Sequence, residues 1–195
     1  MKTLQYFTLV VISVFINYSF AAGDYFPNGF DPFWYSKNLE ALEEPSLFSK
    51  RDEPNLQIYR FTWLRTFHHP TSVRLEINKD MTGILYTKVT SGAAGYDPGR
   101  LTTNESKPIK KDEVAYFLNL IEGERFWKLP TKMQIIASDG TIVLGKDGAQ
   151  WILEGLSGGN YHVVDRWSPK NGSVRKLSLY LLKLSGLKVD DMEIY

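Results

Sequence analysis

Hydrophobic and polar positions alternate along much of the chain after residue 56, and this period of two predicts β-strands. Residues 58–67 are rich in β-branched and aromatic side chains, which favour a strand. The aromatic side chains of that strand share one face: Tyr59, Phe61, Trp63 and Phe67. Ile58 and Leu64 lie among polar residues on the other face, so we expect both faces to be at least partly covered.

Further strands follow the same pattern. Val73, Leu75 and Ile77 alternate with charged residues, which predicts a half-exposed strand that turns at 80–83 into a second strand over 84–89. Four more strands are predicted at 134–137, 141–144, 150–154 and 161–167, with glycine-containing turns at 139–140, 146–148 and 157–160. Residues 92–107 are rich in turn-forming residues and predict a long loop.

Two segments carry the apolar spacing of amphipathic helices. The first covers 111–122, with acidic residues near its start and Gly123 at its end, and its apolar face is Val114, Phe117, Leu118 and Ile121. The second covers 173–184 and ends at Gly186, and its apolar face is Val174, Leu177, Leu181 and Leu184. Strands and helices are grouped along the chain, so the predicted class is α+β, a mainly antiparallel sheet with two amphipathic helices in a single domain over 57–195.

Residues 22–56 form an irregular N-terminal arm in which aromatic residues are frequent. The run from Asp24 to Tyr35 has no sustained period of 2 or 3.6, and a short helix is predicted over 36–44. The clustered aromatic side chains have two interpretations: a recognition strip, or a cover for the core of the domain. We favour the cover, because large aromatic residues are usually buried.

Residues 1–21 have the layout of an export signal. Lys2 precedes an apolar stretch that is densest over 7–16, about half the roughly 20 residues that cross a bilayer. Ser19 and Ala21 supply the small residues that signal peptidase requires, so we expect cleavage after Ala21. The alternative is a buried N-terminal strand or helix. The signal predicts a periplasmic or secreted protein without a stable membrane span in its mature form.

Charge and cysteine content exclude several classes of protein and site. Lys2 is the only charged residue in 1–21, so cleavage lowers the 23 basic residues to 22, equal to the 22 acidic ones. A neutral domain of about 174 residues argues against a nucleic-acid binder and against a polybasic membrane clamp. The chain has no cysteine, which excludes disulfides, thiol nucleophiles and cysteine-ligated metals.

The titratable residues of the predicted strands and turns allow two interpretations. His162, Asp165 and Glu154, with His68, are candidates for a catalytic acid–base site, which needs titratable groups with separated pKa values. In the structural interpretation, which we favour, these side chains form cross-strand ion pairs. Asp165 lies between two aromatic residues of one strand, so we expect a partner for it, either Arg65, Arg74 or a backbone amide.

Metal, cofactor and glycan motifs are weak. The histidines are His68, His69 and His162, and a zinc site would need one of the first two with His162 and an acid. No metal or cofactor is expected, because the spacing of a helical metal motif, a P-loop, a nucleophile elbow and a dinucleotide fingerprint are all missing from the sequence. Asn104 and Asn171 begin glycosylation sequons that matter only in a eukaryotic secretory pathway, and 171–173 also fits the start of the last helix.

Several segments together resemble an uncharacterised family of exported bacterial proteins: 59–70, 91–92 with 95–99, 126–127, and 147–169. The resemblance covers most of the mature chain. It implies a periplasmic or secreted setting and supplies no activity and no site residues.

The leading functional hypothesis is a non-enzymatic binding module of the envelope, which recognises a protein or a glycan. Its candidate binding residues are Tyr96, Trp127, Tyr161, Arg65 and Arg166, of types that are enriched at recognition surfaces. The alternative is a small hydrolase with a His/Asp/Glu site, and a third hypothesis is a structural domain without a ligand. A structure that shows whether the 65–69 turn, the 92–107 loop and the 154–166 hairpin share a cleft would help to distinguish these three hypotheses.

Overall fold

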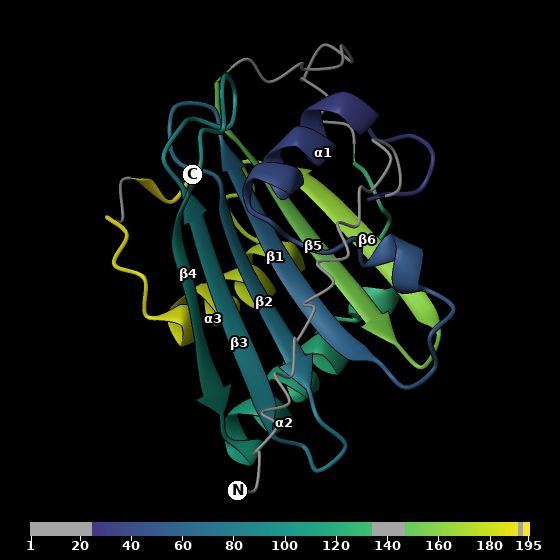
Figure 1. Cartoon of the computed structure of the whole chain (residues 1–195). Coiled ribbons are helices and arrows are strands. Elements are labelled where there is room, and N and C mark those ends of the chain that lie inside the picture. The colour runs from purple at the N-terminus through teal and green to yellow at the C-terminus, as the bar shows by residue number, and fades with distance from the viewer. Residues whose placement is uncertain (1–24, 134–146, 191–192) are drawn as a thin grey trace, which may run out of the picture.

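A six-stranded antiparallel sheet with helices on both faces forms the protein (Figure 1). The structure is a computed structural model and describes residues 25–133, 147–190 and 193–195. In the order β4-β3-β2-β1-β5-β6, the strands are β4 (Leu101–Ile109), β3 (Gly83–Thr90), β2 (Thr71–Ile77), β1 (Gln57–Arg65), β5 (Ala149–Ser157) and β6 (Asn160–Trp167). The helices are α1 (Pro32–Ala41), α2 (Lys111–Gly123) and α3 (Ser173–Ser185), with short 3-10 turns η1 (Phe48–Lys50) and η2 (Phe126–Lys128). The predicted α+β class is confirmed.

The main core lies between the sheet and the pair α2 and α3. The predicted aromatic face of β1 is buried here, with Trp63 fully buried beside Trp151 of β5 at a ring distance of 5.5 Å. Both helices cover it with the predicted apolar side chains, including Phe117 and Leu181. Phe67 is the exception, because it lies beyond the end of β1 and is 55 % exposed.

The N-terminal arm covers the other face of the sheet. Tyr25, Phe26, Phe30, Tyr35 and Leu39 form a second apolar cluster with Leu64, Ile152 and Val163. The interpretation of the arm as a cover for the core is therefore confirmed. Helix α1 begins at Pro32, earlier than the predicted 36, because the carboxylate of Asp31 accepts hydrogen bonds from the amides of Phe33 and Trp34 at 2.9 and 2.7 Å.

Two expectations about the strands are wrong. Residues 101–109 form edge strand β4 instead of a loop, and most of its side chains are exposed and polar, which hides the strand period. Strand β2 is buried on both faces instead of half-exposed: Ser72 and Arg74 are buried, and Arg74 forms an ion pair with Glu44 of the arm. The predicted strands at 134–137 and 141–144 and the export signal lie outside the described residues.

The hairpin between β5 and β6 has the predicted turn. Gly158 and Gly159 have φ values of +57° and +78°, which glycine adopts without strain. The described part of the chain contains no helix that is both long and apolar enough to span a bilayer.

Candidate functional site

A network of charged side chains lies buried between the arm and the sheet. Glu44 of the arm is its centre, with its carboxylate 3.3 Å from Arg60, 2.8 Å from Arg74 and 3.3 Å from Lys88. Arg60 also contacts Glu154 of the neighbouring strand β5 through Nη2 and Nε, at 2.6 and 2.7 Å. The side chains of Arg60 and both glutamates are fully buried, so each charge relies on its partners for solvation.

This network holds the arm on the sheet and leaves Glu154 closed off from solvent. Tyr161 donates a hydrogen bond to Glu154 at 2.9 Å, and burial raises the pKa of both groups. Glu154 does form a cross-strand ion pair, but its partner is Arg60 of β1 instead of His162 or Asp165. Glu154 and Tyr161 are thus structural residues, and neither forms an open site.

Asp165 has a different partner from those predicted. Its carboxylate accepts hydrogen bonds from the hydroxyl of Tyr35 at 2.7 Å and from the amide of Gln150 at 3.2 Å, instead of from Arg65 or Arg74. Burial raises the pKa of Asp165, and the hydrogen bond from Tyr35 opposes this increase. The side chain is closed in under α1.

His162 lies on the opposite face of β6 from Asp165, because side chains alternate along a strand. Its ring packs against Phe126 and Trp127 with ring distances of 5.1 and 6.2 Å, and burial lowers its pKa. Glu154 and Asp165 face the arm instead. The fold therefore does not bring His162 together with Glu154 and Asp165, and the alternative hypothesis of a hydrolytic His/Asp/Glu centre has no support from their geometry.

His68 and Arg65 contact the last described residues of the chain. His68 Nδ1 lies 2.8 Å from the hydroxyl of Tyr195, and Arg65 forms an ion pair with Glu193 at 3.0 Å. Arg65 is buried and stacks on Trp63 at 4.0 Å, so it is not available as a surface binding residue. The described residues contain no group of three or more side chains that could hold a metal ion.

The 65–69 turn, the loop after β3 and the turn of the β5–β6 hairpin do not all lie at the same end of the sheet. The 65–69 turn and the loop after β3 do adjoin, since the amides of Ala94 and Gly95 donate to carbonyls of that turn at 3.1 Å. The turn of the β5–β6 hairpin lies at the other end of the sheet, because Gln57 at the start of β1 pairs with Ser157. Tyr96 is 64 % exposed and its ring lies 6.1 Å from that of Phe67.

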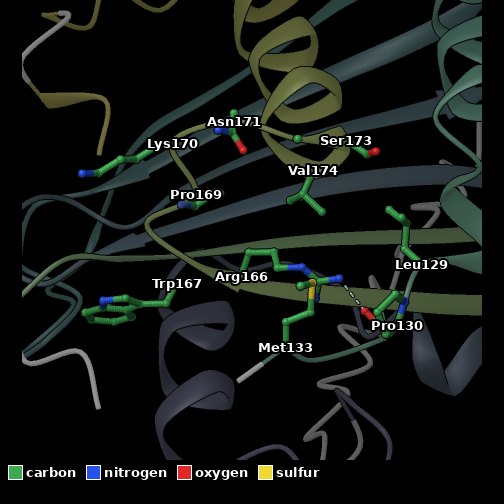
Figure 2. Close-up of a pocket in the computed structure, with 11 residues that line it drawn as sticks. Leu129, Pro130, Met133, Arg166, Trp167, Pro169, Lys170, Asn171, Ser173 and Val174 are labelled. Carbon is green, nitrogen blue, oxygen red and sulfur yellow. Dashed lines mark hydrogen bonds between the residues drawn. The ribbon is translucent and has the colours of Figure 1, made fainter. Parts of the chain in front are cut away.

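A pocket with a volume of about 380 Å³ opens where β6 leads into α3 (Figure 2). We call it the α3 pocket, and its lining residues are Leu129, Pro130, Met133, Arg166, Trp167, Pro169, Lys170, Asn171, Gly172, Ser173 and Val174. Its volume is within the range of small-ligand sites. Two lining residues are basic and none is acidic, so the α3 pocket is electropositive with largely apolar walls.

Arg166 is the central polar group of the α3 pocket. Figure 2 shows its guanidinium between Met133 and Val174, with a hydrogen bond to the carbonyl of Pro130 at 2.7 Å. Further bonds run to the carbonyls of Thr131 at 3.1 Å and of Asp165 at 2.7 Å. A guanidinium carries more N–H groups than these three bonds use, so donors remain for a ligand.

The sequence identified only part of the α3 pocket. Arg166, a predicted binding residue, lines it, whereas Trp127 is partly buried in the main core. The sequence did not reveal the rest of the lining, because residues 129–133 and 169–174 are distant in sequence and come together only in the folded protein. The one local indication was the Asn171–Ser173 turn, in which Gly172 is the N-cap of α3 and provides no side-chain hydrogen bond. The sequence matches no protein-family model, and no curated protein matches it.

Proposed function

We propose that this chain is an exported, non-enzymatic binding module that recognises a segment of another protein through the α3 pocket. The observation that carries the proposal is the pocket itself, a concavity of about 380 Å³ with apolar walls and one guanidinium that retains free donors. Such a combination suits a ligand that is partly apolar and has one polar group to orient it.

The choice of a protein over a glycan rests on the walls of the α3 pocket. Leu129, Pro130, Met133 and Val174 surround the guanidinium of Arg166 and offer no hydrogen-bonding side chains to a sugar. The other polar lining side chains, Lys170, Asn171 and Ser173, lie farther from the guanidinium, near the start of α3. The exposed aromatic residues Phe33, Phe67, Tyr96 and Tyr116 are not among the lining residues of the α3 pocket. A partner with apolar side chains therefore fits this pocket better than a sugar does.

Site-specific photocrosslinking in the native host tests the proposal. A photoreactive amino acid replaces Met133, which lines the α3 pocket and is 64 % exposed. The matched control position is Met81, which is 39 % exposed in the turn between β2 and β3. We expect one discrete protein adduct from position 133 and none from position 81. No adduct at 133, or the same adducts at both positions, would contradict the proposed function.

Export remains a prediction within this proposal. If the mature protein recovered outside the cytoplasm begins at Ala22, the signal and its cleavage site are as expected. Recovery of the intact chain in the cytoplasm would contradict the exported part of the proposal and would leave the crosslinking result to decide the binding part.

A further inference from the structure

The guanidinium of Arg166 lies in the α3 pocket without an acidic partner in the pocket wall. Its three hydrogen bonds all go to main-chain carbonyls, which hold it in place without neutralising its charge. Burial lowers the pKa of Arg166, and only the more distant influence of Asp165 opposes this effect. Asp165 itself is directed to the other face of β6, toward Tyr35.

The shape of the α3 pocket adds a second requirement. Met133 and Val174 flank the guanidinium, and Leu129 and Pro130 close one side of the pocket (Figure 2). Lys170, the other basic lining residue, points away from this group in the same view. A ligand that fills the pocket thus meets one fixed positive charge and several apolar side chains at once.

We propose that the α3 pocket binds a carboxylate that is directly attached to an apolar group, as found at the carboxyl terminus of a protein chain that ends in an apolar residue. This inference rests on the proposed function and specifies the chemistry of its ligand. A carboxylate matches the planar guanidinium and forms charge-assisted hydrogen bonds with it. The apolar group gains free energy by displacing water from the pocket walls.

Binding of four small probes to the purified mature domain tests this inference without any mutation. The probes are two acid and amide pairs, N-acetyl-leucine with N-acetyl-leucinamide and octanoate with octanamide, and calorimetry measures their affinities. Loss of the ion pair in the amides is expected to weaken binding by about 10- to 100-fold, since a hydrogen bond to a charged group contributes about 1.5–3 kcal/mol. Binding of the acids should weaken as the pH falls through the pKa of the ligand.

A variant pair locates the binding. Arg166→Met removes the guanidinium and is expected to bring acid binding down to that of the amides. Arg100→Met, the same substitution at an exposed position outside the α3 pocket, should leave acid binding unchanged. Circular dichroism checks that Arg166→Met remains folded. If this variant does not fold, the comparison of acids with amides in the wild-type protein still tests whether the α3 pocket binds a carboxylate.

The outcomes separate this inference from the proposed function. Equal affinity for acids and amides, or no binding of any probe, overturns the carboxylate inference, and the Met133 crosslink then still decides the function. Binding of N-acetyl-leucine supports the terminus of a protein chain as the source. Binding of octanoate alone supports the carboxylate chemistry but assigns it to a free fatty acid, which counts against the protein partner.

Discussion

Replacement of Arg60 by methionine is expected to destabilise the protein more than any change at its surface. Arg60 is fully buried between two carboxylates, 2.7 Å from Glu154 and 3.3 Å from Glu44, and it also donates to the carbonyl of Pro45 at 2.6 Å. Methionine fills a similar length without charge. After the substitution Glu154 retains Tyr161 as a hydrogen-bond donor, while its charge has lost the guanidinium.

The magnitude follows from the burial of all three side chains. Removing one partner of a buried ion pair costs about 3–5 kcal/mol, because the other charge is left without compensation. That is a large part of the roughly 5–15 kcal/mol by which a typical domain is stable. Burial already raises the pKa of Glu154, and loss of Arg60 raises it further. An acid with a raised folded-state pKa loses stability as pH rises, so the deficit should be largest at neutral pH and smaller near pH 5.

Urea unfolding at pH 7 and pH 5, followed by tryptophan fluorescence, measures these free energies. The control is Arg100→Met, the same substitution at an exposed position, which should change the free energy of unfolding by less than about 0.5 kcal/mol. The double variant with Glu154→Gln removes both charges and should lose less than the sum of the single variants. A loss below about 1 kcal/mol for Arg60→Met at pH 7, or a deficit that grows toward pH 5, would refute the reasoning.

Two further substitutions test the packing of the sheet. At Gly155, an added Cβ would lie 2.6 Å from the ring of Phe126, so Gly155→Ala should lower stability by about 1–3 kcal/mol in thermal unfolding, whereas Gly123→Ala, with no atom within 4 Å, should be neutral or slightly stabilising. Equal effects of the two substitutions would show that the close approach of Phe126 to position 155 does not determine the loss of stability. Tyr35→Phe removes a hydrogen bond of 2.7 Å to Asp165 and should cost about 1–3 kcal/mol at pH 7 in urea unfolding. The loss should be smaller at pH 4, because removal of the donor raises the pKa of Asp165 further, and an unchanged loss would indicate that the carboxyl is already protonated at pH 7.

Most of the fold follows from local sequence patterns. Alternating β-branched and aromatic residues predicted β1, and apolar residues at helical spacing predicted α2 and α3, because these elements bury one continuous face. Strand β4 was not predicted, because an edge strand with exposed polar side chains has no apolar face that would reveal the period of two. Its pairing with β3 becomes apparent only in the folded sheet.

The buried charges and the α3 pocket depend on contacts between distant segments. Arg60 is 94 residues from Glu154 and 16 from Glu44, so no local spacing connects these three side chains. Arg166 was identified as a binding residue by its type alone. Its apolar surroundings come from two segments, one that precedes β5 in the sequence and one that follows β6. Residue types alone therefore suggested candidates but did not show which of them the fold would bury.

The two edges of the sheet also bear on self-association. The outer edge of β4 carries the charged side chains of Glu105 and Lys107 and, near its end, Pro108, which has no amide hydrogen to donate. At the opposite edge, the chain lies along β6, and the amide of Asp165 donates to the carbonyl of Thr131 at 2.7 Å. Among the described residues, neither edge thus presents an apolar, fully open row of backbone groups to another sheet. We therefore expect these edges to disfavour strand addition by a second copy of the chain, the contact through which an unprotected edge templates fibrils.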